Sequence, residues 1–309
     1  MRTGGFTFCG AEGTGIYVYR WLPDSDTAIK AAVSIVHGMA ETAARYERFA
    51  AALTAAGFAV YAPDLRGHGR TAGIPENVGY LGQGDGFAMM IADLHRLHGM
   101  IGEENPGLPF FLFGHSMGSF LVQGYISRWG KELQGAILSG TAGKFGVLLY
   151  PALAIATAEM TLRGRRARSL LLKILVFGGF NRQFRPNRTP FDWLTSDAAE
   201  VDKFIRDPFC GRIFSTSFFR DFFRFLLKIH TAETLNAIPR DLPVYMFSGD
   251  RDPLGKNTRS VLELLRMYRE IGVRDVTAKV YPGGRHEMLN EVNREEVTSD
   301  ALRWLEGHC

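Results

Sequence analysis

The chain has 309 residues, of which 46% are hydrophobic and 22% charged, with a formal net charge of +4. Because 32 acidic residues nearly balance 36 basic ones, the composition is that of an ordinary globular protein and not of a nucleic-acid-binding one. No apolar stretch reaches the roughly 20 residues of a membrane-spanning helix, and the N-terminus lacks the apolar segment of a signal peptide. The three cysteines have neither pairing nor metal-binding spacing, so we expect free thiols in a cytoplasmic protein.

Strands and helices alternate in the first half of the chain. A β-hairpin is predicted over residues 6–21, and apolar runs of strand length follow at 31–36, 58–61, 110–113 and 135–139. Apolar residues recur at helical spacing between these runs, over 46–56, 87–97 and 121–129. The alternation predicts an α/β fold with a doubly wound, mostly parallel sheet.

The alternation stops near Thr141 and resumes with predicted strands at 242–247 and 276–281, each followed by a predicted helix. The intervening residues have helical patterns, so we expect a core of residues 1–140 and 238–309 with a helical cap inserted at 141–237. A basic stretch within it, 163–188, contains eight arginines and lysines and no acid. Such a stretch is compatible with peripheral contact to an anionic membrane, although a solvated arginine-rich face is the simpler interpretation.

The most informative stretch is Gly114-His-Ser-Met-Gly118, which follows the apolar run 110–113 and precedes a helical pattern. This G-x-S-x-G pattern between a strand and a helix is typical of a sharp turn that holds its central serine in a strained, exposed position. The pattern identifies Ser116 as a candidate nucleophile.

A serine nucleophile needs a histidine to take its proton and a carboxylate to orient that histidine. Enzymes with this turn supply them from the ends of later strands, in the order serine, acid, histidine. The next two predicted strands end in Asp250 and Asp252 and, through a glycine loop, in His286. His286 is therefore the candidate base and either aspartate the candidate acid, whereas we expect His37, His68 and His115 to support the site or brace loops.

The oxyanion of an acyl-transfer intermediate needs two fixed N–H donors. One is expected to be the backbone N–H of Met117, at the start of the helix after Ser116. The loop His37-Gly-Met39 follows a predicted strand, and its Met39 N–H is the candidate for the second donor.

Five blocks of the sequence together resemble the monoacylglycerol lipase and lysophospholipase branch of the α/β-hydrolases, also described as the serine aminopeptidase family. They are His37-Gly-Met-Ala-Glu41 with Arg45-Tyr46, Asp64-Leu-Arg-Gly-His-Gly69, Gly114-His-Ser-Met-Gly118, Gly249-Asp-Arg-Asp-Pro253, and Arg285-His-Glu287 with Asn290-Glu291. The resemblance implies Ser116 as nucleophile, Asp252 as acid, His286 as base, and Met39 and Met117 as oxyanion donors. It also makes Gly38, Glu41 and His115 candidate substrate contacts. Ala40 and Ser119 stand where the family often has glycine.

The sequence thus predicts a serine hydrolase of carboxylic esters, with a monoacylglycerol or lysophospholipid as substrate. The chemistry is complete with protein groups and water, so we expect no metal and no organic cofactor. Small esters remain an alternative, as does an aminopeptidase in which Glu41 or Asp192 holds the substrate's amine. A member of the fold that binds a ligand without turnover is the alternative from a different class.

Overall fold

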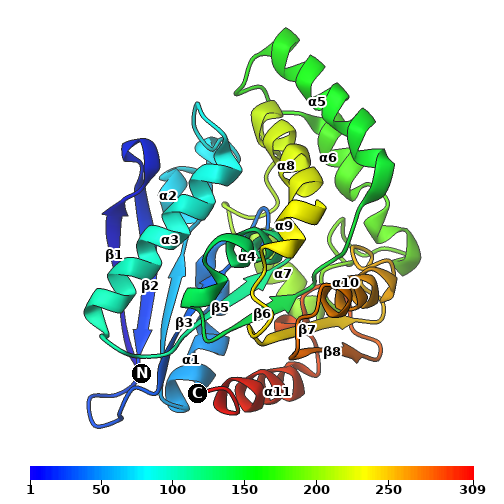
Figure 1. The fold of residues 1–309 in the computed structure, drawn as a ribbon. Helices are drawn as coiled ribbons and strands as arrows, with labels where there is room; N and C mark the ends of the chain where they lie inside the picture. Colours follow the sequence, from blue (N-terminus) through cyan, green and yellow to red (C-terminus); the bar gives the residue numbers. More distant parts are fainter.

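The computed structural model describes all 309 residues and contains one eight-stranded sheet with strand order β1-β2-β4-β3-β5-β6-β7-β8 (Figure 1). Strands β1 and β2 pair antiparallel, as do β2 and β4, and every later pair is parallel. The strands are β1 (Arg2–Cys9), β2 (Gly15–Leu22), β3 (Ala31–Val36), β4 (Phe58–Pro63), β5 (Phe110–His115), β6 (Gly135–Ser139), β7 (Val244–Gly249) and β8 (Val276–Tyr281). The predicted doubly wound α/β fold is confirmed.

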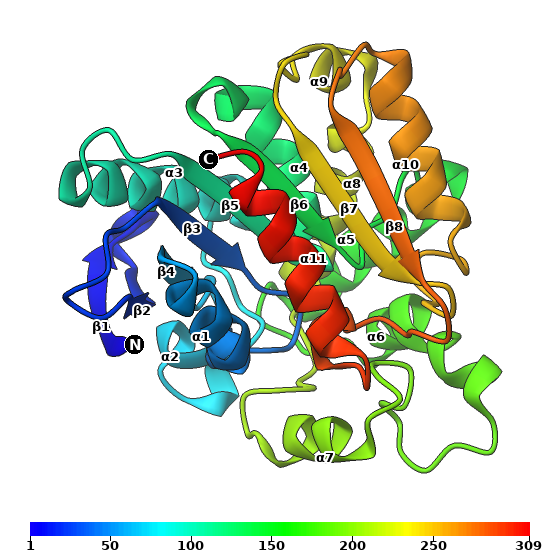
Figure 2. The same cartoon turned by 90° about the horizontal axis from the view of Figure 1, so that it is seen from below.

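Helices cover both faces of this sheet, as Figure 2 shows from below. Phe49 and Leu53 of α1 and Val297 and Leu305 of α11 pack in one apolar cluster with side chains of the strands. The cluster on the opposite face is larger and includes residues of α3, α4 and α10. The bounds of the core helices are α1 (Glu47–Ala55), α2 (Gly69–Ala72), α3 (Gly86–Glu104), α4 (Met117–Trp129), α10 (Arg259–Glu270) and α11 (Arg294–Glu306).

The chain between β6 and β7 is helical and joins the core through aromatic side chains. On α8, Phe222 and Phe225 stack on Phe87 of α3 at ring-centroid distances of 5.4 and 5.1 Å. Its α-helices are α5 (Leu149–Arg163), α6 (Leu170–Phe177), α7 (Ala198–Arg206), α8 (Thr216–Ile229) and α9 (Ala232–Asn236). Residues of α5, α6 and α8 line one cavity together with Ser116, so these helices lie beyond the carboxyl end of β5.

Several arginines of the basic stretch 163–188 serve the fold. Arg165 donates to the carbonyl of Gly84 at 3.1 Å, and Arg168 donates to that of Ile213 at 3.0 Å. Arg188 pairs with Asp202 at 2.7 Å. These three arginines thus have internal or local partners.

The start of one strand differs from the prediction. Strand β7 begins two residues later than predicted because Pro243 has no N–H to donate to a neighbouring strand. The first N–H of β7 that donates is that of Val244, which lies 2.8 Å from the carbonyl oxygen of Asp275, just before β8. Cys9, Cys210 and Cys309 are free thiols. None of the helices combines the length and apolar character that crossing a membrane requires.

Candidate active site

Ser116 occupies the turn between β5 and α4 and has a backbone conformation that few non-glycine residues adopt. Its φ is 53° and its ψ is −120°, and such strain costs about 1–3 kcal/mol, which the surrounding structure must offset. The turn is this tight only because Gly118 has no side chain, since a Cβ there would overlap the carbonyl of Val36 on β3. Ser119 adds a brace, since its hydroxyl donates to the Ser116 carbonyl at 2.6 Å.

The structure brings Ser116, His286 and Asp252 into one hydrogen-bonded chain. His286 Nε2 lies 2.9 Å from Ser116 Oγ, and His286 Nδ1 lies 3.0 Å from each carboxylate oxygen of Asp252. Asp252 and His286 are both almost completely buried, with 0% and 2% exposure. The distances are those required for proton transfer from the hydroxyl to the imidazole.

Asp252, rather than Asp250, faces the base. Its carboxylate also accepts from the Leu254 N–H at 2.9 Å and from the Ser248 hydroxyl at 3.1 Å, which fixes its orientation. Asp250 instead accepts from the Gly283 N–H at 2.8 Å and thereby holds the loop before His286. Either aspartate could be the acid on sequence alone, but in the structure the two have different partners.

Burial and charge act in opposite directions on the acid and the base. Burial by itself lowers the pKa of His286, but the adjacent Asp252 carboxylate outweighs it and raises that pKa above 6.5. Burial likewise favours protonation of Asp252, yet the charge and hydrogen bond of His286 hold the pKa of Asp252 below 3.8. Each group thus stabilises the charged form of the other.

The loop after β3 lies against Ser116. A Cβ on Gly38 would come within 3.1 Å of the Ser116 Cβ, so glycine allows the close approach. The next residue, Met39, donates its backbone N–H to no group of the protein. The Met117 N–H, in the first residue of α4, has no acceptor within the helix. Both candidate oxyanion donors are therefore free to bind a ligand oxygen.

Glu41, a candidate substrate contact, is engaged by the protein itself. Its carboxylate accepts from the Gly38 N–H at 2.5 Å, from Arg45 at 2.5 Å and from the Tyr46 hydroxyl at 2.9 Å. Asp192, the other candidate anchor for an amine, accepts from the Arg188 and Thr189 amides. Neither carboxylate is left for an ammonium group.

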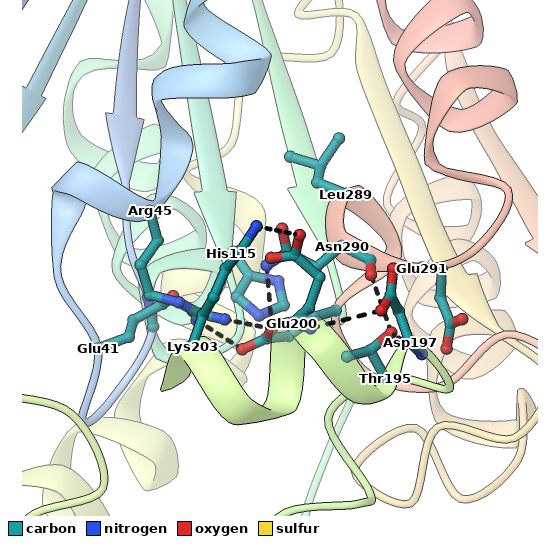
Figure 3. A network of polar contacts seen from close by, with 12 residues as sticks. Glu41, Arg45, His115, Thr195, Asp197, Glu200, Lys203, Leu289, Asn290 and Glu291 are labelled. Atoms are coloured by element: carbon teal, nitrogen blue, oxygen red, sulfur yellow. Dashed lines mark hydrogen bonds and ion pairs between the residues drawn. The ribbon is translucent and has the colours of Figure 1, made fainter. Parts of the chain in front are cut away.

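Arg45 and Glu287 belong to the site, although no role was predicted for either of them. Arg45 donates to both oxygens of Glu287, at 2.7 and 2.6 Å, and thereby joins the residue after His286 to the Gly38–Glu41 loop. Figure 3 shows Glu41, Arg45 and His115 at one side of a wider polar network that continues along α7 to Asn290 and Glu291. The one feature of the sequence that could have indicated this contact is Glu287, an acidic residue directly after the candidate base.

The other histidines near the site hold loops. His37 accepts from the Leu65 N–H at 3.0 Å through Nε2, and His68 Nδ1 lies 2.8 Å from the Arg66 carbonyl. His115 Nδ1 lies 3.1 Å from the Ser139 hydroxyl, and its ring is 4.8 Å from that of His286. Burial, with a contribution from His286, lowers the pKa of His115 to about 3, so it is neutral beside the base.

Ser116 and His286 open into a cavity of about 620 Å³ with mainly hydrophobic walls. The ring of Trp193 lies 5.1 Å from that of His286 and closes one side of it. Further wall residues are Phe145, Leu149, Ile174, Phe177, Phe222 and Leu226. The cavity has the size and the apolar character of a small-molecule site.

Comparison with known proteins places this geometry in a family. The profile of the family described as serine aminopeptidase, S33, matches residues 27–293. A monoacylglycerol lipase of Mycolicibacterium smegmatis is 30% identical over 304 residues, covering 98% of this chain and 96% of that protein. Human monoglyceride lipase is 26% identical over 302 residues, covering 94% and 86%.

The structural likeness extends over the whole chain. A thermostable carboxyl esterase from Bacillus coagulans, solved in complex with glycerol, superposes with a TM-score of 0.92 at 30% identity and 99% coverage of both chains. Profile, relatives and structure agree with the resemblance carried by the five sequence blocks. The chain belongs to the serine aminopeptidase family (S33) of α/β-hydrolases.

Proposed function

We propose that the chain is a carboxylic-ester hydrolase that cleaves monoacylglycerols through an acyl-enzyme on Ser116. The observation that carries this proposal is the Ser116–His286–Asp252 chain of hydrogen bonds at the inner end of an apolar cavity. The names of the relatives support the same reaction class, since they are a monoacylglycerol lipase, a monoglyceride lipase and a carboxyl esterase.

The reaction follows from the positions of these groups. Ser116 Oγ attacks the ester carbonyl carbon while His286 Nε2 takes the hydroxyl proton, and Asp252 stabilises the imidazolium that forms. The N–H groups of Met39 and Met117 bind the oxyanion. His286 returns the proton to the departing glycerol oxygen, which leaves the acyl group on Ser116. Water then attacks this ester with His286 again as base, and the fatty acid leaves.

The walls of the cavity favour an acyl chain over a peptide. An aminopeptidase needs a carboxylate for the substrate's ammonium group, but Glu41 and Glu287 at the cavity are already paired with Arg45. Apolar walls instead remove an acyl chain from water, at about 0.8 kcal/mol for each buried CH₂. This comparison makes monoacyl lipids the preferred substrates.

Lysophospholipids are the second candidate because of the unpaired cations at the cavity. Lys173, Lys256 and Arg212 all line it, and none of them forms an ion pair. Burial lowers the pKa of Lys173 because it disfavours the charged ammonium group. A phosphate beside this ammonium would stabilise its charged form. Lys173→Met should therefore reduce kcat/KM for a lysophospholipid more than for a monoacylglycerol.

We propose further that residues 141–237 form a cap, inserted between core segments 1–140 and 238–309, that rests on a lipid surface. Large apolar side chains of this segment face solvent, including Val147, Leu148 and Leu162 at 77, 76 and 84% exposure. Arg166 and Arg182, which have no acidic partner, lie in the same segment and suit an anionic surface. Co-sedimentation with phosphatidylglycerol vesicles should decrease in a Leu148→Asp, Leu162→Asp variant.

The function is tested by hydrolysis of p-nitrophenyl esters from acetate to palmitate, followed by monooleoylglycerol, a lysophospholipid and an aminoacyl anilide. Wild type should prefer medium or long chains, and Ser116→Ala should lose on the order of a millionfold in turnover. A maximum at acetate would favour a small-ester esterase, and cleavage of the anilide alone would favour an aminopeptidase. Equal rates for wild type and Ser116→Ala would leave only the non-catalytic binding member of the fold.

A further inference from the structure

A second cluster of polar side chains lies at the opposite end of the sheet from Ser116. His95 and His98 are one turn apart on α3, which packs beside α4 (Figure 1). Glu132, on the short helix η4 (Gly130–Glu132) that follows α4, faces both of them. The proposed ester hydrolysis uses none of the three.

The three potential ligand atoms converge on one point. Nδ1 of His95 and Nδ1 of His98 lie 3.7 and 3.6 Å from the same carboxylate oxygen of Glu132. Ligands of a tetrahedral zinc ion at bond lengths of about 2.0–2.1 Å are about 3.3 Å apart. The two histidine–Glu132 separations are therefore a few tenths of an ångström from those of a bound ion, and all three ligand atoms lie within 4.8 Å of one another. The Glu132 side chain is 47% exposed and is free to make this adjustment.

Both imidazoles are held in this orientation by aromatic neighbours. The His95 ring stacks on Trp129 at 4.0 Å and 8°, and the His98 ring stacks on Phe110 at 4.0 Å and 11°. Their Nδ1 atoms also lie 3.2 and 2.8 Å from the single hydroxyl of Tyr125. Fixed rings bind a metal with little loss of conformational freedom.

The protonation of the two rings is compatible with metal binding. The Tyr125 hydroxyl has one proton, so it can donate to only one of the two Nδ1 atoms. Neither Nε2 forms a hydrogen bond with the protein, so each is free to carry the ring proton while Nδ1 offers its lone pair. Neutral imidazole is the form that binds metals.

We propose that Nδ1 of His95, Nδ1 of His98 and a carboxylate oxygen of Glu132 bind a divalent transition-metal ion. Two imidazoles and one carboxylate form a ligand set typical of zinc, with water completing the tetrahedron. Harder cations such as Mg²⁺ prefer oxygen ligands, and this cluster has one carboxylate only.

The ion would link α3 to the end of α4 and would take no part in ester hydrolysis. Phe110, under His98, is the first residue of β5, whereas Ser116 follows its last residue. The six residue steps from Phe110 to Ser116 span about 20 Å in an extended chain. The expected effect of the ion is therefore a higher unfolding temperature with unchanged turnover, since a ligand that binds only the folded state stabilises it.

The test uses the full-length chain without a histidine tag, stripped of metal with EDTA and dialysed. Zn²⁺ affinity is measured by competition with a chromophoric chelator, and Co²⁺ binding by the visible absorption of tetrahedral Co²⁺. We expect one equivalent of Zn²⁺, an intense Co²⁺ spectrum and a zinc-dependent rise in Tm of several degrees. His95→Ala and His98→Ala should each weaken Zn²⁺ binding at least about 100-fold, the upper end of the cost of losing an outer-shell partner.

His308→Ala, which removes a histidine elsewhere on the surface, is the matched control and should bind Zn²⁺ like wild type. Glu132→Gln keeps the shape of the third ligand and should lose affinity even if a histidine variant fails to fold. Hydrolysis by each variant in metal-free buffer reports whether its fold is intact. Absence of Zn²⁺ binding by wild type, or equal binding by wild type and the His95, His98 and Glu132 variants, would overturn the proposal.

Discussion

Arg45 and Glu287 form a buried, bidentate ion pair between two segments that are 242 residues apart in sequence. Arg45 also binds Glu41, whose carboxylate holds the Gly38 amide. One guanidinium thus connects the loop that supplies a candidate oxyanion donor with the loop that supplies the candidate base. The relative position of the two loops depends on this side chain.

Glu287→Gln should therefore reduce both stability and turnover. Breaking a buried ion pair by removing one partner costs about 3–5 kcal/mol, and we expect the lower end because Arg45 keeps Glu41 as a partner. Urea unfolding at pH 7 measures the loss. The matched control is Glu296→Gln, which removes an exposed partner of Lys279 and should leave the urea midpoint unchanged.

The same pair predicts a pH dependence of stability. Burial alone would raise the pKa of Glu287, but Arg45 outweighs it and lowers that pKa to about 2 from an ordinary value of 4.5. Because the folded-state pKa is the lower one, the stabilisation is complete above pH 4.5 and is lost as the pH falls toward 2. The difference in unfolding free energy between wild type and Glu287→Gln should therefore narrow below pH 4.5. A constant difference from pH 7 to 3 would contradict this.

The pH dependence of turnover should depend on His286. The imidazole must be neutral to accept the Ser116 proton, and Asp252 raises its pKa above 6.5. kcat/KM should therefore rise with pH through an apparent pKa above 6.5. Asp252→Asn should move this limb to lower pH while it reduces the maximal rate by about 10⁴-fold. Ester hydrolysis in a pH-stat measures both, and a wild-type limb below 6.5 would argue against the assigned base.

Much of the fold and part of the candidate site could be predicted from local sequence. The strand, turn and helix around Ser116 were predictable because the apolar run, the flanking glycines and the helical spacing lie within 20 residues. His286 was predictable from its place after the last strand. In both cases the proposed role belongs to one residue at the end of one element, and periodicity locates that element.

Contacts between distant segments were not predictable in this way. Nothing in the sequence pairs Arg45 with Glu287, because ion-pair partners have no fixed spacing. Glu41 was expected to contact substrate and does line the cavity, but the three internal hydrogen bonds of its carboxylate could not be read from the sequence. Likewise, Glu132 joins His95 and His98 only because α3 and α4 pack together. Tertiary packing, and not local pattern, decides these roles.

Gly38→Ala should lower kcat with a smaller change in KM. The new Cβ would lie 2.8 Å from the Glu41 carboxylate and 3.1 Å from the Ser116 Cβ. Because three donors fix that carboxylate, the loop must move instead, and the Met39 N–H moves with it. Loss of one oxyanion donor costs about 10²–10³-fold in kcat. Steady-state kinetics measures the change, and Gly102→Ala, whose Cβ would meet no atom within 4 Å, should keep wild-type kinetics.

Ala40 offers the opposite test, in which a side chain is removed from the same loop. Its φ is 60°, a left-handed conformation that costs a non-glycine residue about 1–2 kcal/mol. Ala40→Gly relieves this strain. It also increases the conformational entropy of the unfolded chain, which costs about 0.4–1 kcal/mol of stability, and it removes one buried methyl group that contributes a similar amount. The opposing effects nearly cancel, so the urea midpoint should change little and kcat should be retained.

Ala40→Val, by contrast, places a β-branched residue at positive φ, where such residues are genuine outliers. The loop should then leave the left-handed conformation and break the 2.9 Å hydrogen bond from Gly211 N–H to the Ala40 carbonyl. Since Met39 is the adjacent residue, kcat should fall together with stability. Wild-type kcat in Ala40→Val would mean that the backbone conformation of this loop does not position the oxyanion donor.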